Sequence, residues 1–221
     1  MTNSVARWMR AGGLTVRAEF VTPWGICDLV GLSFDRKRVA NRLKLKQTAA
    51  ICSITRAVLL LEIPDVKTGK STTLDKLVRR CAPSIPGDVV SAETERLVAD
   101  RFVVETSRRR LQRVNGWMPL QKRLVAVELK LTRIEEAIRQ ALSNRGFAEE
   151  SYVALPSDVA RRAASNISRR SKFFDASVGL LGVARRSCRV LVPAHRKQPG
   201  GDKAIQFYCV EKFWRTRVKG N

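Results

Sequence analysis

Hydrophobic periodicity changes twice along this 221-residue chain, and the changes divide it into three parts. Residues 14–21 and 26–34 have the apolar content of two strands joined by a turn, after a short helix at residues 4–11. Residues 37–119 have the spacing of amphipathic helices separated by prolines. From residue 120 the α/β pattern returns, with strands expected at 124–131, 151–155, 178–183 and 189–192 and helices at 133–145, 157–170 and 204–215. We therefore predict a discontinuous α/β domain, residues 1–36 and 120–221, interrupted by an inserted domain at residues 37–119.

The expected insert has the element order of a winged helix-turn-helix domain. Helices are predicted at 50–63, 72–81 and 91–101, the last with Ser91 as its N-cap, followed by a hairpin of residues 102–105 and 111–117. The third helix, with Arg96, would lie in the DNA major groove, and a basic turn that begins at Ser107 would contact phosphates through Arg108, Arg109 and Arg110. Two alternatives remain: the arginines form a solvated tip, or the domain docks a protein.

The charge balance points to a polyanionic partner. The chain has 42 Lys and Arg against 20 Asp and Glu, a net charge of +22 with a pI near 11. Such a charge opposes compaction unless a polyanion shares it, and nucleic acid is the most common such partner. Arg161 and Arg162 are among the pairs expected to line a DNA channel. The alternatives are a generic basic protein and a protein of the membrane surface; no apolar run is long enough to span a bilayer.

Cysteine and histidine usage excludes two kinds of site. The five cysteines are scattered and form no Cys-x-x-Cys pair, and His195, in a Gly/Pro-rich loop, is the only histidine. This usage argues against structural zinc and against histidine-centred catalysis, and is typical of reduced thiols in a cytoplasmic, here nucleoid-associated, protein.

Two apolar strands carry isolated charges. Glu128 and Lys130 share one face of the strand at 124–131, and Asp28 lies within the strand at 26–34. A buried lone carboxylate costs several kcal/mol, roughly, unless a cation or a donor compensates it. If the two strands are neighbours, a divalent ion would compensate both acids, and Lys130 would point at the same place. The alternative for Glu128 and Lys130 is an ordinary surface ion pair.

The ordered set Glu19, Asp28, Glu128, Lys130 and Gln140 resembles the PD-(D/E)XK nuclease superfamily. The resemblance covers the first 36 residues and roughly the last hundred, and one departure is Cys27 where the family has proline. It implies a restriction-endonuclease-like fold, a three-layer core around a central mixed sheet. Glu19 is alternatively a solvated partner of Arg17, and Gln140 an exposed helix residue.

The resemblance also implies an activity, metal-dependent hydrolysis of DNA that leaves a 5′-phosphate. Asp28, Glu128 and Glu19 would hold Mg²⁺, for which Mn²⁺ would substitute, and Lys130 would act on the attacking water with Gln140 nearby. The partner would be duplex or branched DNA, with a homodimer possible because two strands need two sites. The alternatives are a noncatalytic DNA-binding or regulatory protein that retains the fold, and an enzyme of RNA processing.

Overall fold

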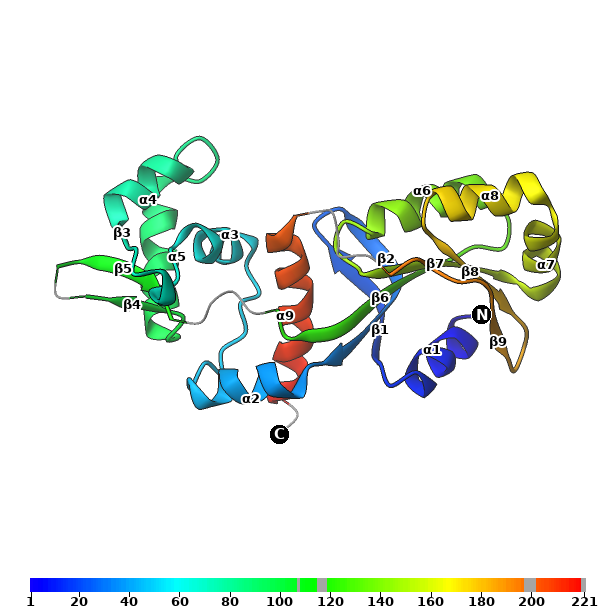
Figure 1. Cartoon of the computed structure of the whole chain (residues 1–221), viewed down its shortest axis with the longest axis horizontal. Helices are drawn as coiled ribbons and strands as arrows, with labels where there is room; N and C mark the ends of the chain where they lie inside the picture. Colours follow the sequence, from blue (N-terminus) through cyan, green and yellow to red (C-terminus); the bar gives the residue numbers. More distant parts are fainter. Residues whose placement is uncertain (107, 115–118, 197–201, 220–221) are drawn as a thin grey trace. The chain divides into compact units, whose positions relative to one another are not determined.

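The structure of the protein, a computed structural model, describes all residues except 107, 115–118, 197–201 and 220–221 (Figure 1). The chain forms two compact units. Unit 1 comprises Met1–Ser33 and Gln121–Gln206, and unit 2 comprises Phe34–Leu120 and Phe207–Asn221. The expected insert at 37–119 thus corresponds to most of unit 2, but unit 2 also includes the C-terminal residues that were assigned to the α/β domain.

Unit 1 is built on a six-stranded mixed sheet. Its strand order is β1 (Thr15–Thr22), β2 (Gly25–Phe34), β6 (Gln121–Leu129), β7 (Glu150–Pro156), β8 (Gly179–Val183) and β9 (Cys188–Val192). The pairs β1–β2 and β8–β9 are antiparallel, whereas β6, β7 and β8 run parallel. The parallel strands are almost entirely buried, because helices cover both faces of such a sheet.

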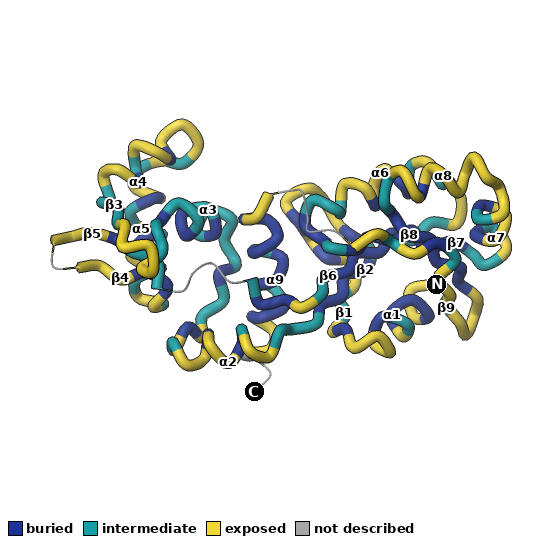
Figure 2. Tube along the Cα trace, in the orientation of Figure 1, coloured by how far each residue is buried: buried dark blue, intermediate teal, exposed yellow. Residues whose placement is uncertain are grey.

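Helices cover both faces of this sheet. On one face, α1 (Thr2–Ala11) buries Val5 and Met9 against Val125 and Val127. On the other face lie α6 (Ile134–Asn144), α7 (Ser157–Ser165) and α8 (Ile167–Asp175). Their buried apolar residues cluster with those of β7 and β8, two strands that Figure 2 colours as buried. The expected α/β layers around a central mixed sheet are confirmed. The strand expected at 124–131 ends at Leu129, and Leu131 beyond it is exposed.

Unit 2 is mostly helical and contains a small three-stranded sheet of order β3-β5-β4. Its elements are α2 (Arg36–Lys44), α3 (Ile54–Glu62), the 3₁₀ turn η1 (Val66–Thr68), β3 (Thr72–Thr73), α4 (Leu74–Cys81), α5 (Gly87–Ala99), β4 (Val103–Glu105), β5 (Arg110–Arg113) and most of α9 (Lys203–Lys219). Side-chain caps begin three of the helices: Asp35 for α2, Ser53 for α3 and Thr73 for α4.

Several predicted boundaries were wrong, each for a local reason. Helix α2 was not predicted, because its run of Arg and Lys has little apolar content. Ser91 is not an N-cap: α5 begins at Gly87 after Pro86, and the Ser91 hydroxyl donates to the Gly87 carbonyl. The predicted helix 157–170 is two helices, with Asn166 ending α7 and capping α8. The expected wing residue Ser107 and the end of the expected strand 111–117 lie outside the described residues.

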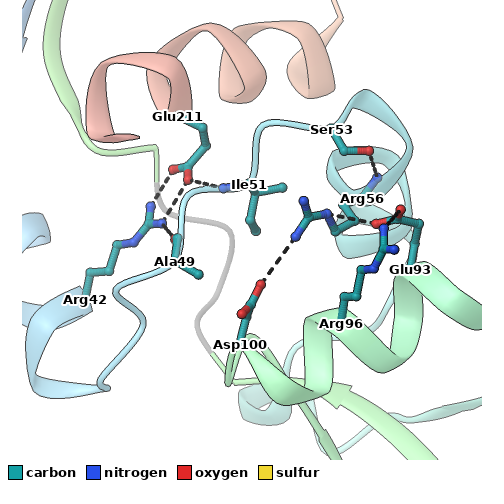
Figure 3. Close-up of polar contacts among 9 residues, drawn as sticks. All are labelled: Arg42, Ala49, Ile51, Ser53, Arg56, Glu93, Arg96, Asp100 and Glu211. Atoms are coloured by element: carbon teal, nitrogen blue, oxygen red, sulfur yellow. Dashed lines mark hydrogen bonds and ion pairs between the residues drawn. The ribbon is translucent and has the colours of Figure 1, made fainter. Parts of the chain in front are cut away.

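A buried ion pair joins α2 to α9 within unit 2. The Arg42 guanidinium is bidentate to the Glu211 carboxylate, with Nη2 2.8 Å from Oε2 (Figure 3). Arg42 is 2% exposed and Glu211 is fully buried. Glu211 Oε2 also accepts from the Ile51 backbone N–H at 2.8 Å, and Arg42 donates to the carbonyls of Gln47 and Ala49. Both charges are therefore fully hydrogen-bonded, which is the condition under which burial of an ion pair is tolerated.

We predict that Arg42→Met destabilises unit 2 by about 3–5 kcal/mol, because it leaves the Glu211 carboxylate buried without its partner. Urea denaturation followed by circular dichroism measures the loss. As a control, Arg80→Met removes an exposed ion pair with Glu62 and is expected to cost less than about 1 kcal/mol. Equal effects of the two substitutions would contradict the assignment.

Candidate functional site

Asp28 and Glu128 lie on adjacent strands of unit 1. The Asp28 carboxylate, on β2, accepts a hydrogen bond through Oδ2 from the backbone N–H of Leu129 on β6, at 2.7 Å. This bond fixes Asp28 beside the residue that follows Glu128. The two acids predicted from distant parts of the sequence are therefore close together in the structure.

The Glu128 side chain is 5% exposed and is held by the end of α6. Asn144 Nδ2 donates to Glu128 Oε1 at 2.6 Å and also contacts Cys27 Sγ at 3.5 Å. Burial raises the pKa of Glu128 above its usual value, and the negative charge of Asp28 raises it further, whereas the Asn144 hydrogen bond and the Lys130 charge act in the opposite direction. Glu128 is thus a carboxyl group whose ionised form lacks enough compensation from the protein alone.

Lys130 follows directly after β6. Its backbone N–H donates to the Ala154 carbonyl at 3.1 Å, so the sheet geometry continues to this residue. Its ammonium lies 3.7 Å from Glu136 Oε1 on α6 and is partly exposed. The positive charge is near enough to Glu128 to lower the pKa of that carboxyl. Lys130 is therefore near Glu128, and Glu136 is its ion-pair partner.

Glu19 lies across the β1–β2 ladder from Asp28. The ladder pairs Ala18 with Leu29 and Phe20 with Cys27, which leaves Glu19 opposite Asp28. Glu19 has a left-handed backbone conformation (φ 47°), which is uncommon for a residue with a side chain, and it is exposed. Within the described part of the chain, the Glu19 side chain makes no hydrogen bond or ion pair, so Glu19 lies beside the site without a fixed role in it.

Asn144, rather than Gln140, is the α6 residue that reaches Glu128. Gln140 is exposed one turn earlier on the same helix. Gln140 and Asn144 lie on the same face of α6 as Ala137, so the sequence indicated which face of the helix could reach Glu128. It did not indicate which turn of that face would do so. The N-cap of α6 is Arg133, which has a left-handed conformation and makes no side-chain capping hydrogen bond.

The ligand set available to a metal is small. Among the described residues, no group of three or more His, Cys, Asp or Glu side chains is arranged to hold a metal ion. Asp28 and Glu128 remain as a pair of oxygen ligands, with the Cys27 thiol near Glu128. Burial and the Glu128 charge raise the pKa of the Cys27 thiol well above its usual value, so that thiol is a neutral hydrogen-bond donor and not a thiolate ligand.

The predicted DNA-contacting arginines differ in their surroundings. In unit 2, Arg96 is paired with Glu93 at 2.7 Å, Arg110 Nε donates to Ser71 Oγ at 2.6 Å, and Arg108 and Arg109 are exposed at the turn between β4 and β5. In unit 1, Arg161 and Arg162 are exposed on α7; Arg161 donates to the Ser157 carbonyl, and Arg162 pairs with Asp158 at 3.1 Å.

A cleft of 740 Å³ in unit 2 lies along α5 and the turn between β4 and β5. Arg108 and Arg109 line it together with three carboxylates, Asp75, Glu95 and Glu105. The surface beside the helix expected to read DNA is therefore not uniformly basic.

Comparisons with known proteins add little to this geometry. No protein-family model matches the sequence, and no curated protein is significantly similar to it. One similar solved structure is a protein of unknown function from Silicibacter pomeroyi, with 12% sequence identity and a TM-score of 0.43, covering 98% of this chain and 83% of that one. The site must therefore be interpreted from its own residues. Within the described part of the chain, the helices are too short or too polar to cross a bilayer.

We predict that Glu128→Gln stabilises the metal-free protein at neutral pH. The folded state holds the Glu128 proton more tightly than the unfolded state does, so its contribution to stability is present below the usual pKa of 4.5 and is lost as the pH rises through the raised value. The neutral amide avoids that loss. Thermal denaturation with chelator, in acid and at neutral pH, measures the difference, and Glu135→Gln at an exposed α6 position is the control. A stability gain of the same size at both pH values would contradict the pKa direction.

We further predict that Asn144→Leu raises the Glu128 pKa, because it removes the hydrogen bond that favours the carboxylate. Carbon-detected NMR titration of the Glu128 carboxyl group measures this directly. Gln140→Leu, one turn away on the same helix, should leave the titration unchanged. If the two variants titrate alike, Asn144 has no effect on the acid.

Proposed function

We propose that this chain is a metal-dependent deoxyribonuclease that hydrolyses DNA phosphodiester bonds at the site formed by Asp28, Glu128 and Lys130. The observation that carries the proposal is the hydrogen bond from the Leu129 N–H to Asp28, which holds Asp28 beside the strand that carries Glu128. Lys130 follows Glu128 by two residues, and its charge lowers the pKa of that carboxyl. Three such groups in one place, two of them in otherwise apolar strands, are the residue types used for phosphoryl chemistry with a divalent ion.

The topology of unit 1 supports the resemblance to the PD-(D/E)XK superfamily. Along the chain the elements follow the order α1, β1, β2, β6, α6, β7, and the four strands are neighbours in the sheet in that same order. Asp28 is on the second of these strands and Glu128 near the end of the third, as the resemblance implies. The restriction-endonuclease-like fold is therefore part of the proposal.

Magnesium is compatible with the residues present. Mg²⁺ commonly takes one or two carboxylates and completes its shell with waters and substrate phosphate, so a third protein ligand is not required. The raised pKa of Glu128 next to Asp28 indicates a position where added positive charge would be stabilised. Asp28 and Glu128 would hold the ion, and Glu19 would have to change its side-chain position to join them.

The protein's own groups would divide the work of the reaction. When bound, the metal would supply positive charge for the phosphate and lower the pKa of a water. Asn144 holds one oxygen of Glu128 in a fixed direction. Lys130 would donate to a phosphate oxygen or orient the water, and Glu136 keeps its ammonium near the end of β6.

Unit 2 is proposed to assist DNA binding as a winged-helix-like domain. Its elements α3, β3, α4, α5, β4 and β5 follow the helix and strand order of that fold, and β3 pairs with β5. Arg108 and Arg109 at the turn between β4 and β5 are exposed and are suited to phosphate contact.

The alternative function is a noncatalytic DNA-binding or regulatory protein with this fold. One observation favours it: all three key groups already have partners within the protein, namely Leu129 for Asp28, Asn144 for Glu128 and Glu136 for Lys130. A site whose three groups each have a partner within the protein can persist without turnover.

We predict that Glu128→Gln and Lys130→Ala each reduce DNA cleavage by a factor of about 100 or more, because each removes charge at the reacting phosphate. Cleavage of plasmid, branched DNA and RNA with Mg²⁺ or Mn²⁺, with and without chelator, measures the effect, and gel shifts measure DNA binding, which should be largely retained. Gln140→Ala is the matched control and should cleave normally. Wild-type protein that shifts DNA but gives no products with either ion would establish the noncatalytic alternative.

A further inference from the structure

The tip of the β1–β2 hairpin exposes an apolar surface beside the candidate site. Val21 and Ile26 face each other across the ladder and are 52% and 65% exposed, and Trp24 in the turn is 49% exposed. We propose that this surface, Val21, Trp24 and Ile26, binds unpaired bases, so that the substrate is DNA with single-stranded or branched character next to the bond that is cut. This inference rests on the proposed function for its placement of the scissile phosphate.

The Trp24 indole is fixed on one side and free on the other. One edge lies against Gly146, so closely that a Cβ atom there would be 2.5 Å from the indole ring. The ring also contacts the buried Phe147, with centroids 6.5 Å apart. Half of the side chain nevertheless remains accessible. A ring held in this way loses little conformational entropy when a base stacks on it, which favours binding.

The apolar surface lies close to the acidic pair along the chain. Ile26 precedes Asp28 by two residues on β2. Gly146, which contacts Trp24, follows Asn144 by two residues, and Asn144 donates to Glu128. A nucleotide whose phosphate lay at Asp28 and Glu128 would place the neighbouring base near Ile26 and Trp24.

Nucleic acid fits this surface better than a second copy of the chain. Each copy carries a net charge of +22, which opposes self-association, whereas a strand of DNA supplies negative charge together with flat apolar bases. Bases inside a duplex are already stacked on each other and cannot use the indole. Stacking on an exposed ring therefore selects bases that are unpaired, and every base offers a π-face, so no sequence preference is needed.

The test compares a forked duplex, with 2-aminopurine in its unpaired arm, and a blunt duplex of equal length. Binding is measured in chelator, so that it does not depend on catalysis. We expect Trp24→Leu to weaken fork binding about tenfold and to abolish quenching of 2-aminopurine, while blunt-duplex binding is unchanged. Trp24→Phe should retain most of the binding, and Ile26→Ser, which leaves the Gly146 contact intact, should weaken it in the same direction.

The control variant is Phe174→Leu, which should bind both DNAs normally. Phe174 is an exposed aromatic residue on α8, outside the hairpin. Melting temperatures of all variants check the fold. The proposal would be overturned if Trp24→Leu and Ile26→Ser bound the fork as tightly as wild type does. It would also be overturned if these substitutions changed the oligomeric state and left the DNA affinity unchanged, since the surface would then join two copies. If the two variants lose fork binding but the wild-type protein cleaves no DNA, only the nuclease proposal is rejected.

Discussion

The fold of unit 1 depends on the pairing of β6 with β2. These two strands are separated in the sequence by residues 34–120, which belong to unit 2. At this seam the Leu129 N–H is satisfied by the carboxylate of Asp28 and not by a backbone carbonyl. A buried N–H without an acceptor costs about 1–3 kcal/mol. Asp28 is therefore both a structural acceptor and a candidate ligand. Replacement by alanine would confound the two roles, whereas asparagine retains an acceptor and removes the charge, which is the informative change at this position.

Unit 2 is completed by a segment far away in the sequence. Glu211 on α9 meets Arg42 on α2, and Arg42 also lies over the rings of Phe102 and Trp214, with its guanidinium carbon 5.0 and 4.7 Å from their centroids. The cation thus has its carboxylate partner and two aromatic contacts in one place. These contacts explain why the C-terminal residues belong with the helical unit. The predicted insert, residues 37–119, therefore lacked α9, the helix that carries the partner of the buried Arg42.

Features with a local pattern of residues could be predicted from the sequence, whereas features that depend on tertiary contacts could not. The strands of unit 1 were recognisable because parallel strands are apolar throughout, and Asp28 and Glu128 stood out because a charge in such a strand needs compensation. Helix α2 was missed because its stability comes from the Asp35 cap and tertiary contacts, not from an apolar stripe. Asn144 and Gln140 share a stripe, and only the position of α6 along β6 decides between them. Pairing of residues as distant as 42 and 211 has no local signature.

Charge decides how unit 2 could meet DNA. Helix α5, the helix predicted from the sequence to enter the major groove, carries Asp88, Glu93 and Glu95 but only one arginine, Arg96. Glu93 binds both that arginine and Arg56 (Figure 3). The cleft beside it adds further carboxylates. Phosphates would be repelled along this helix and attracted at the turn between β4 and β5, where Arg108 to Arg110 are exposed. The charges of unit 2 therefore favour a DNA contact made by that basic turn, without insertion of α5 into the groove. Such a contact would give affinity without sequence readout.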